Sequence, residues 1–132
     1  MKIKKSKRQK QRDNPLSGYW MRQADKEFGR IFHSRQWSCL ICGKGTVQMA
    51  HLIPRENYLY RWDMENVIPL CGCHHRLSTK ISYHNAPLAF MAWMRKNYPE
   101  RLDWVEEHKE IITRKAELPW TFREKYEELQ KL

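Results

Sequence analysis

Residues 39–74 decide the fold, because they contain Cys39-Leu-Ile-Cys42 and, further along the chain, Cys71-Gly-Cys-His74. A spacing of two residues lets one tight turn present both ligands to the same metal ion. Two such pairs of thiolate and imidazole ligands make the closed tetrahedral site that structural zinc prefers. We therefore expect Cys39, Cys42, Cys71 and His74 to bind a structural Zn²⁺. Cys73 is the alternative to His74 as the fourth ligand.

Three polar residues lie around these two pairs. His51 falls in a β-rich segment, residues 46–53, that Pro54 stops, and Asn66 precedes a second expected strand, residues 67–70. His75 lies at the start of an expected helix. A zinc site joining such short strands would supply folding energy and bring the three side chains together. A neutral imidazole can take a proton from water, a cation can offset charge on a leaving oxygen, and an amide can hold the loop or ligate the metal.

These segments carry a resemblance to a known family. Cys39-x-x-Cys42, Ala50-His51-Leu52-Ile53-Pro54, Asn66-Val67-Ile68-Pro69-Leu70-Cys71 and His74-His75 resemble the HNH endonuclease motif of the ββα-metal fold. The resemblance implies an enzyme, a metal-dependent HNH DNA endonuclease that hydrolyses phosphodiester bonds. It implies that His51 is the general base, Asn66 the central Asn and His75 the final His. It also implies that His75 and Asn66 hold a catalytic divalent ion, Mg²⁺ or Mn²⁺.

The sequence departs from the family pattern at Ala50. Many HNH enzymes have an Asp or His there as a metal ligand. The candidates to complete the metal shell are Asp63, Glu65, His84 and Asn85. The departure also motivates an alternative function, a catalytically inactive zinc-dependent module for DNA binding or as a recombination accessory.

A narrower resemblance extends over residues 17–132. Tyr19-Trp20-Met21-Arg22-Gln23-Ala24, Arg61-Trp62 and Trp120-Thr121 with the terminal helix are similar to the phage NinG (Rap) recombination nucleases. The similarity implies a phage or prophage origin, the cytoplasm of a bacterial host, and branched or junction DNA as substrate. A homodimer is expected if a four-way junction is cut symmetrically.

The expected fold class is α+β, a zinc-stapled ββα-metal (HNH) core of about residues 38–84 with one N-terminal and about three C-terminal flanking helices. Apolar residues with a period of 3.6 predict the N-terminal helix, at Trp20, Ala24, Phe28, Ile31 and Phe32. In the helical extension, residues 85–132, Asn85 is the expected N-cap of a helix. An apolar stripe from Leu102 to Ile112 predicts another, and Thr121-Phe-Arg-Glu124 is a capping box that opens the last.

The charge is concentrated at the N-terminus. The 132 residues suffice for one domain, expected over residues 17–132, and carry a formal net charge of +10. Residues 1–12 contain 7 of the 25 basic residues and no acid, so we expect residues 1–16 to form a basic flexible arm that binds nucleic acid. The residues expected to contact DNA phosphates are Lys4, Lys5, Lys7, Arg8, Arg55, Arg61, Arg76 and Lys80.

The apolar segments are short. None reaches the roughly 18 residues of a membrane span, and none follows the basic N-terminus as in a secretory signal. We therefore expect no membrane partner and a reducing, cytoplasmic location. Clustered cysteines indicate a metal site there rather than disulfides.

Overall fold

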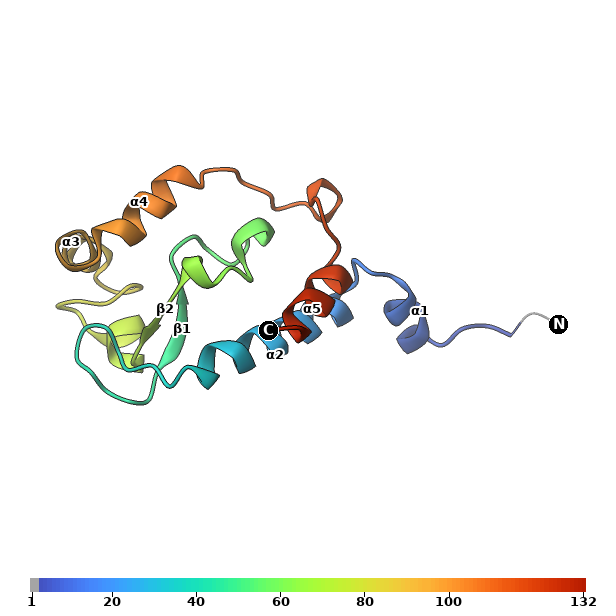
Figure 1. Ribbon diagram of the computed structural model, residues 1–132, viewed down its shortest axis with the longest axis horizontal. Helices are drawn as coiled ribbons and strands as arrows, with labels where there is room; N and C mark the ends of the chain where they lie inside the picture. Colours follow the sequence, from blue (N-terminus) through green and yellow to red (C-terminus); the bar gives the residue numbers. More distant parts are fainter. Residues whose placement is uncertain (1–2) are drawn as a thin grey trace.

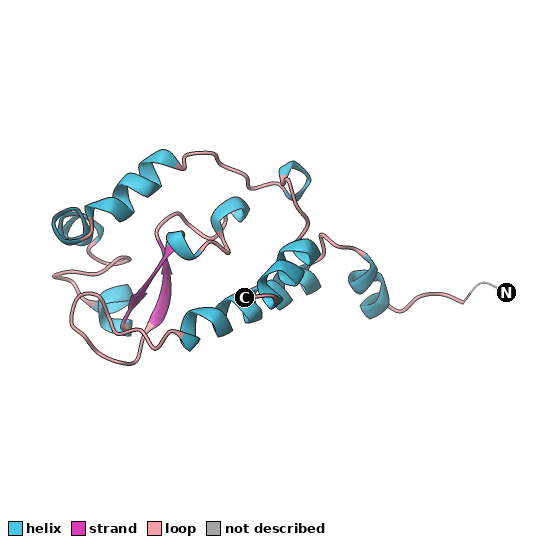
Figure 2. Ribbon diagram, viewed as in Figure 1, coloured by secondary structure: helices cyan, strands magenta, loops and turns pink. Residues whose placement is uncertain are grey.

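Two short strands and five α-helices make up the protein, whose computed structural model describes residues 3–132 (Figures 1 and 2). In chain order the elements are α1 (Lys7–Asp13), α2 (Gly18–Ser34), β1 (Gln48–His51), β2 (Val67–Leu70), α3 (Pro87–Asn97), α4 (Pro99–Glu107) and α5 (Phe122–Gln130). A π-helical segment, Cys73–Leu77, follows β2. The fold is α+β, as the sequence predicts.

β1 and β2 form a two-stranded antiparallel sheet. Ala50 lies opposite Ile68, and His51 lies opposite Val67. The second strand has the predicted bounds, whereas the first is shorter than the predicted segment 46–53. Pro69 lies within β2, where a residue without an N–H is tolerated because each strand of a two-stranded sheet has a free edge.

The sheet separates two clusters of buried side chains, because successive residues of a strand point to opposite faces. Val67 packs with Phe28 of α2 and Phe122 of α5. Ile68 packs instead with Ala50 of β1 and Phe90 of α3. The same strand pair therefore anchors helices from both ends of the chain.

The predicted helices that flank the sheet are present. α2 and α5 lie side by side, as the blue and red ribbons of Figure 1 show. The predicted capping box opens α5: Thr121 Oγ1 accepts from the Glu124 backbone N–H at 3.1 Å, and Glu124 Oε1 accepts from the Thr121 N–H at 3.2 Å. Three helices, α3, α4 and α5, follow the sheet as expected.

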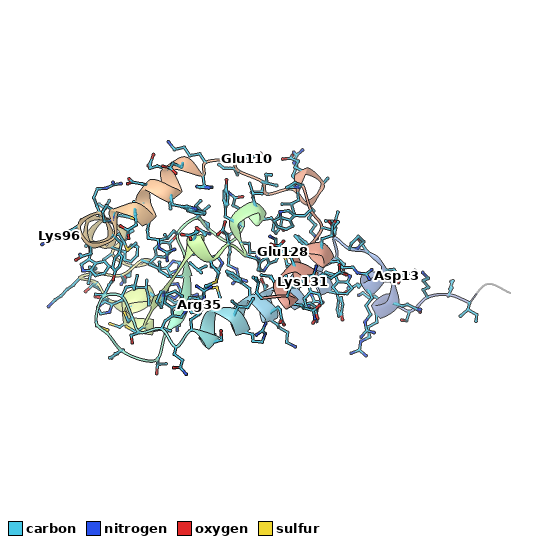
Figure 3. All side chains as sticks on the ribbon, in the orientation of Figure 1. Asp13, Arg35, Lys96, Glu110, Glu128 and Lys131 are labelled. Carbon is cyan, nitrogen blue, oxygen red and sulfur yellow. The ribbon has the colours of Figure 1, made fainter. Side chains whose placement is uncertain are left out.

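Part of the predicted basic arm is helical. Residues 7–13 are helical, and the Ser6 side chain caps the helix by accepting from the Gln9 N–H at 3.1 Å. The Trp20 indole donates to the Arg12 carbonyl at 2.9 Å and so holds α1 against α2. Figure 3 labels Asp13 at this end of the molecule and Lys96 of α3 at the other. Residues 1–2 of the arm lie outside the described residues.

Two predictions for the C-terminal half are wrong in detail. Asn85 is not the N-cap of α3, which begins at Pro87, and its side chain donates to the Leu77 carbonyl at 3.3 Å instead. The stripe to Ile112 is not one helix, because α4 ends at Glu107. Ile112 is buried outside the helices, and its own backbone N–H donates to Asn57 Oδ1 at 3.1 Å. Within residues 3–132, no helix has the length and apolar character needed to cross a membrane.

We expect Thr121→Ala to lower the free energy of unfolding by about 1 kcal/mol, because it leaves a helix N–H without its acceptor. Urea denaturation would measure the change. Thr113→Ala, at an exposed position outside the helices, is the control and should leave the stability within about 0.5 kcal/mol of the parent. Equal effects of the two substitutions would contradict the capping role.

Candidate metal centre and adjoining cleft

Three cysteines and one histidine from distant segments meet in one cluster. The ligand atoms of Cys39, Cys42, Cys71 and His74 all lie within 4.8 Å of one another. The Cys42 and Cys71 sulfurs are 3.7 Å apart, and His74 Nδ1 lies 3.3 Å from the Cys71 sulfur. Zinc–sulfur bonds of about 2.3 Å place two sulfurs of a tetrahedral site roughly 3.8 Å apart. The spacing and the donor types therefore fit a zinc ion.

The cysteine-rich turn before β1 is held by its own backbone. The Cys39 N–H donates to the Lys44 carbonyl at 2.8 Å, and the Gly43 N–H donates to the Cys39 carbonyl at 2.9 Å. Gly43 has a φ of 77°, in the left-handed region that glycine adopts without strain. The Leu40 N–H donates to the Pro69 carbonyl at 3.1 Å. This bond places the first ligand pair beside the end of β2, from which the second pair follows.

The cluster also favours the thiolate form of Cys39. Burial raises the pKa of this thiol, but hydrogen bonds from the backbone of Cys71, Cys42 and Ile41 and from His74 outweigh that effect. Together they lower the pKa to about 6. The thiolate is the form of cysteine that binds metal.

The fourth member of the cluster is His74 and not Cys73. Cys73 lies outside the cluster with its side chain exposed, although it is the residue next to His74. The π-helical segment turns the two neighbouring side chains in different directions. The alternative that the spacing left open is thus settled by the geometry.

A cleft of about 680 Å³ lies next to the metal centre. It is bordered by α2, by β1 with the loop that follows it, and by the π-helical segment with the residues after it. Its polar lining residues are Asp25, His51, Arg55, Glu56, Arg61, His75, Arg76, Tyr83 and His84. His51 and His75, the two predicted catalytic imidazoles, therefore lie on one cleft.

His51 is held in one protonation pattern. Its Nε2 lies 2.9 Å from the Arg61 carbonyl oxygen, and because a carbonyl only accepts, Nε2 carries the proton. Nδ1 then has a free lone pair. Burial lowers the pKa of His51, and the charges of Arg55 and Arg61 lower it further, against the Arg61 hydrogen bond and the charge of Asp25, which raise it. The lowered pKa favours the neutral imidazole, which is the form that can act as a base.

In His75 the proton is on the other ring nitrogen, Nδ1. His75 is buried, and its Nδ1 donates to Gln48 Oε1 at 2.7 Å, which leaves the Nε2 lone pair free. Burial, and then the neighbouring His84, Arg76 and His51, lower its pKa to about 4. Metal-bound histidines commonly donate their other N–H to an oxygen acceptor in this way. The His84 ring lies 4.9 Å from the His75 ring between centroids, so a second imidazole is close by.

Asn66 holds the loop and does not face the cleft. Its side chain is fully buried, and Oδ1 accepts from the Ile53 N–H at 2.7 Å. Nδ2 donates to the carbonyls of Ile53 and Tyr60, each at 3.0 Å. The amide thus ties Ile53, at the start of the loop after β1, and Tyr60, in the middle of that loop, to the start of β2. Burial and these bonds hold the oxygen away from the cleft, so the structure gives no support to the expected role of Asn66 as a metal ligand.

The arginines divide into two kinds. Arg61 is buried and forms a two-bond ion pair with Asp25, from Nε at 3.0 Å and from Nη2 at 2.8 Å. Its guanidinium is engaged by a carboxylate at the cleft, and its expected contact with phosphate stays a prediction. Arg55 and Arg76 are exposed at the cleft, and Arg55 lies 3.6 Å from Asp25. Lys80 is exposed but does not line the cleft.

Ala50 carries no ligand atom and does not line the cleft. Ala50 is fully buried on the α3 side of the sheet, opposite in direction to its neighbour His51. Of the candidates to complete a metal shell, His84 alone lines the cleft. Asp63 caps a short 3₁₀ turn, and Glu65 pairs with Arg101 at 3.7 Å.

Two residues at or beside the cleft escape sequence reasoning: Asp25 lines it, and Gln48 contacts the lining residue His75. Gln48 orients His75 and Asp25 holds Arg61, yet each is a common polar residue with no motif around it. The one signal for Asp25 is its place directly beside the apolar stripe of α2, where Ala24 and Phe28 are buried.

Substitution can test the ligand set. We expect Cys71→Ala to lose stoichiometric zinc and to lower the melting temperature, because metal binding contributes to folding. Cys73→Ala, two residues away, should keep the zinc and the parent stability within about 0.5 kcal/mol. Metal analysis by mass spectrometry and thermal denaturation would measure both. Zinc loss in Cys73→Ala together with zinc retention in His74→Ala would reverse the assignment.

Comparisons with protein-family models, with curated proteins and with solved structures found no match to this chain. The interpretation of the metal centre and the cleft therefore depends on the residues and contacts described above.

Proposed function

We propose that the protein is a metal-dependent HNH-type DNA endonuclease. The observation that carries the proposal is the pair of oriented imidazoles, His51 with a free Nδ1 and His75 with a free Nε2, on one cleft. They come from a strand pair and the helical segment after it, which the three cysteines and His74 hold together. The order of these residues is the order of the HNH motif that the sequence resembles.

In this proposal His51 takes the proton from the attacking water, because its imidazole is neutral and half-buried. His75 and His84 would hold the divalent cation. When bound, that cation would offset the charge that develops on the leaving oxygen. Nitrogen donors suit a transition-metal ion better than Mg²⁺, which binds through oxygen, so Mn²⁺ is the better candidate of the two expected ions.

The basic residues would position the nucleic acid. Arg55 and Arg76 lie at the cleft, where they can contact phosphates on either side of the bond to be cut. Lys4, Lys5, Lys7 and Arg8 lie exposed on α1 and the segment before it. We propose branched recombination DNA in a bacterial cytoplasm as the substrate, and a homodimer as the active form, on the similarity to the phage NinG (Rap) nucleases.

The alternative is a zinc-dependent DNA-binding or recombination accessory module without nuclease activity. Ala50 favours it, because the residue that supplies a metal ligand in many HNH enzymes is missing. The two functions differ in whether the protein cuts any DNA when Mn²⁺ or Mg²⁺ is present.

We expect the protein to cut plasmid or four-way junction DNA with Mn²⁺, and His51→Ala to lower kcat by about 100-fold or more. Zinc content and DNA affinity should stay at the parent values. The exposed His33→Ala on α2 is the matched control and should cut at the parent rate. The general-base assignment fails if His51→Ala cuts as fast as the parent. Absence of cutting by the parent on every DNA and metal favours the accessory module.

The pH dependence of cutting should reflect the environment of His51. Because its pKa lies below the ordinary value of 6.5, the base stays neutral, and kcat/KM is retained, as the pH falls through 6.5. The rate should be lost only at lower pH, as His51 is protonated. Arg55, Arg61, Asp25 and His75 surround this imidazole.

Removing one cationic neighbour provides the check. Arg55→Gln should move the acidic limb of the kcat/KM profile upward, because one charge that lowers the pKa of His51 is gone. Zinc content measured at each pH separates this effect from metal loss. An acidic limb above 6.5 in the parent would contradict the role given to His51.

A further inference from the structure

Both carboxylate oxygens of Asp25 accept hydrogen bonds from Arg61 and Trp62. The Arg61 backbone carbonyl is in turn the hydrogen-bond partner of His51. Asp25 Oδ1 accepts from Arg61 Nε at 3.0 Å and from the Trp62 indole at 2.9 Å, and Oδ2 accepts from Arg61 Nη2 at 2.8 Å. A two-bond pair between guanidinium and carboxylate fixes orientation as well as distance. Asp25 thus determines how residues 61 and 62 lie against α2.

Arg61 connects this ion pair to the candidate base. Its side chain is directed to Asp25 and is only 10% exposed, while its backbone carbonyl accepts the His51 Nε2 proton at 2.9 Å. Its Nη1 also donates to the Arg55 carbonyl at 3.3 Å. The Arg61 carbonyl determines which nitrogen of His51 carries the proton, and the position of that carbonyl depends on the Asp25 carboxylate of α2.

Apolar contacts already join α2 to the loop that contains Arg61, without the Asp25–Arg61 ion pair. Phe28 of α2, Trp62 and Phe122 already form one buried apolar cluster across the same boundary. Burying charged groups carries a desolvation cost that apolar residues of similar size avoid. A charged pair retained at the edge of the cleft, one hydrogen bond from His51, points to a directional role.

We propose that Asp25 is a positioning residue for His51. Through Arg61 it fixes the carbonyl that keeps the proton on His51 Nε2 and the lone pair on Nδ1. The catalytic consequence rests on the proposed nuclease function, whereas the tautomer itself can be measured in a protein that cuts nothing.

The direct test is the ¹⁵N NMR spectrum of the histidine side chains in the zinc-loaded protein. The parent should show His51 as the Nε2–H tautomer, and Asp25→Asn should show a mixture of the two neutral tautomers. Glu27→Gln is the matched control, because Glu27 lies on the same helix and pairs with Arg30 at 2.8 Å without lining the cleft. Unchanged His51 shifts in Asp25→Asn would overturn the proposal.

A second variant guards against a folding defect in Asp25→Asn. Arg61→Lys keeps the positive charge but cannot form the two-bond pair, so it should produce the same mixture of tautomers. Zinc content and melting temperature identify which variants are folded. An Arg61→Lys protein with the parent tautomer would also overturn the proposal.

Kinetics separates this role from general stability. In a protein that cuts DNA, Asp25→Asn should lower kcat roughly tenfold with KM changed less than twofold, because only the orientation of the base is altered. Added to His51→Ala, the same substitution should have no further effect on kcat. A further fall in the double variant would show that Asp25 acts elsewhere. If the parent cuts no DNA, the nuclease proposal fails while the tautomer measurement still decides the role of Asp25.

Discussion

The convergence of Cys39, Cys42, Cys71 and His74 is the constraint on which the rest of the structure depends. Two strands of four residues are marginal alone in water, and their connection of 15 residues, 52–66, gives little local guidance to pairing. Two residues of the cluster precede β1 and two follow β2, so the cluster joins the chain before the first strand to the chain after the second. The cluster also sets the start of the π-helical segment, and so the position of His75 directly after His74.

A buried amide, Asn66, and a partly buried ion pair, Arg61 with Asp25, hold the loop between the two strands in place. Asn66 ties the loop to β2 through three hydrogen bonds, and Arg61 ties it to α2 through Asp25. Each uses strong directional bonds in a place where the backbone has no regular partner. Together they hold the Arg61 carbonyl at hydrogen-bond distance from His51. The orientation of the candidate base therefore depends on residues that are not part of the Cys/His cluster.

The elements that were predictable share a local cause. β2 lies between an amide and a cysteine and contains only apolar residues, and α5 begins with a capping box that needs four consecutive residues. The metal ligands were predictable because their spacing reflects the reach of a single turn. Predictions failed where a distant contact overrides the local signal. The Leu77 carbonyl accepts a hydrogen bond from the Asn85 side chain, and Asn57 Oδ1 accepts one from the Ile112 N–H.

The sequence by itself determined the residue types of the candidate metal cluster, the α+β order of elements, and the two imidazoles, His51 and His75, that line the cleft. Only the tertiary structure decided that His74 and not Cys73 completes the cluster, that Asn66 and Arg61 are buried, and that Asp25 lines the cleft and pairs with Arg61. The reason is physical. Ligand spacing and apolar periodicity are properties of neighbours along the chain, whereas burial and hydrogen-bond partners depend on segments that meet only when the chain is folded.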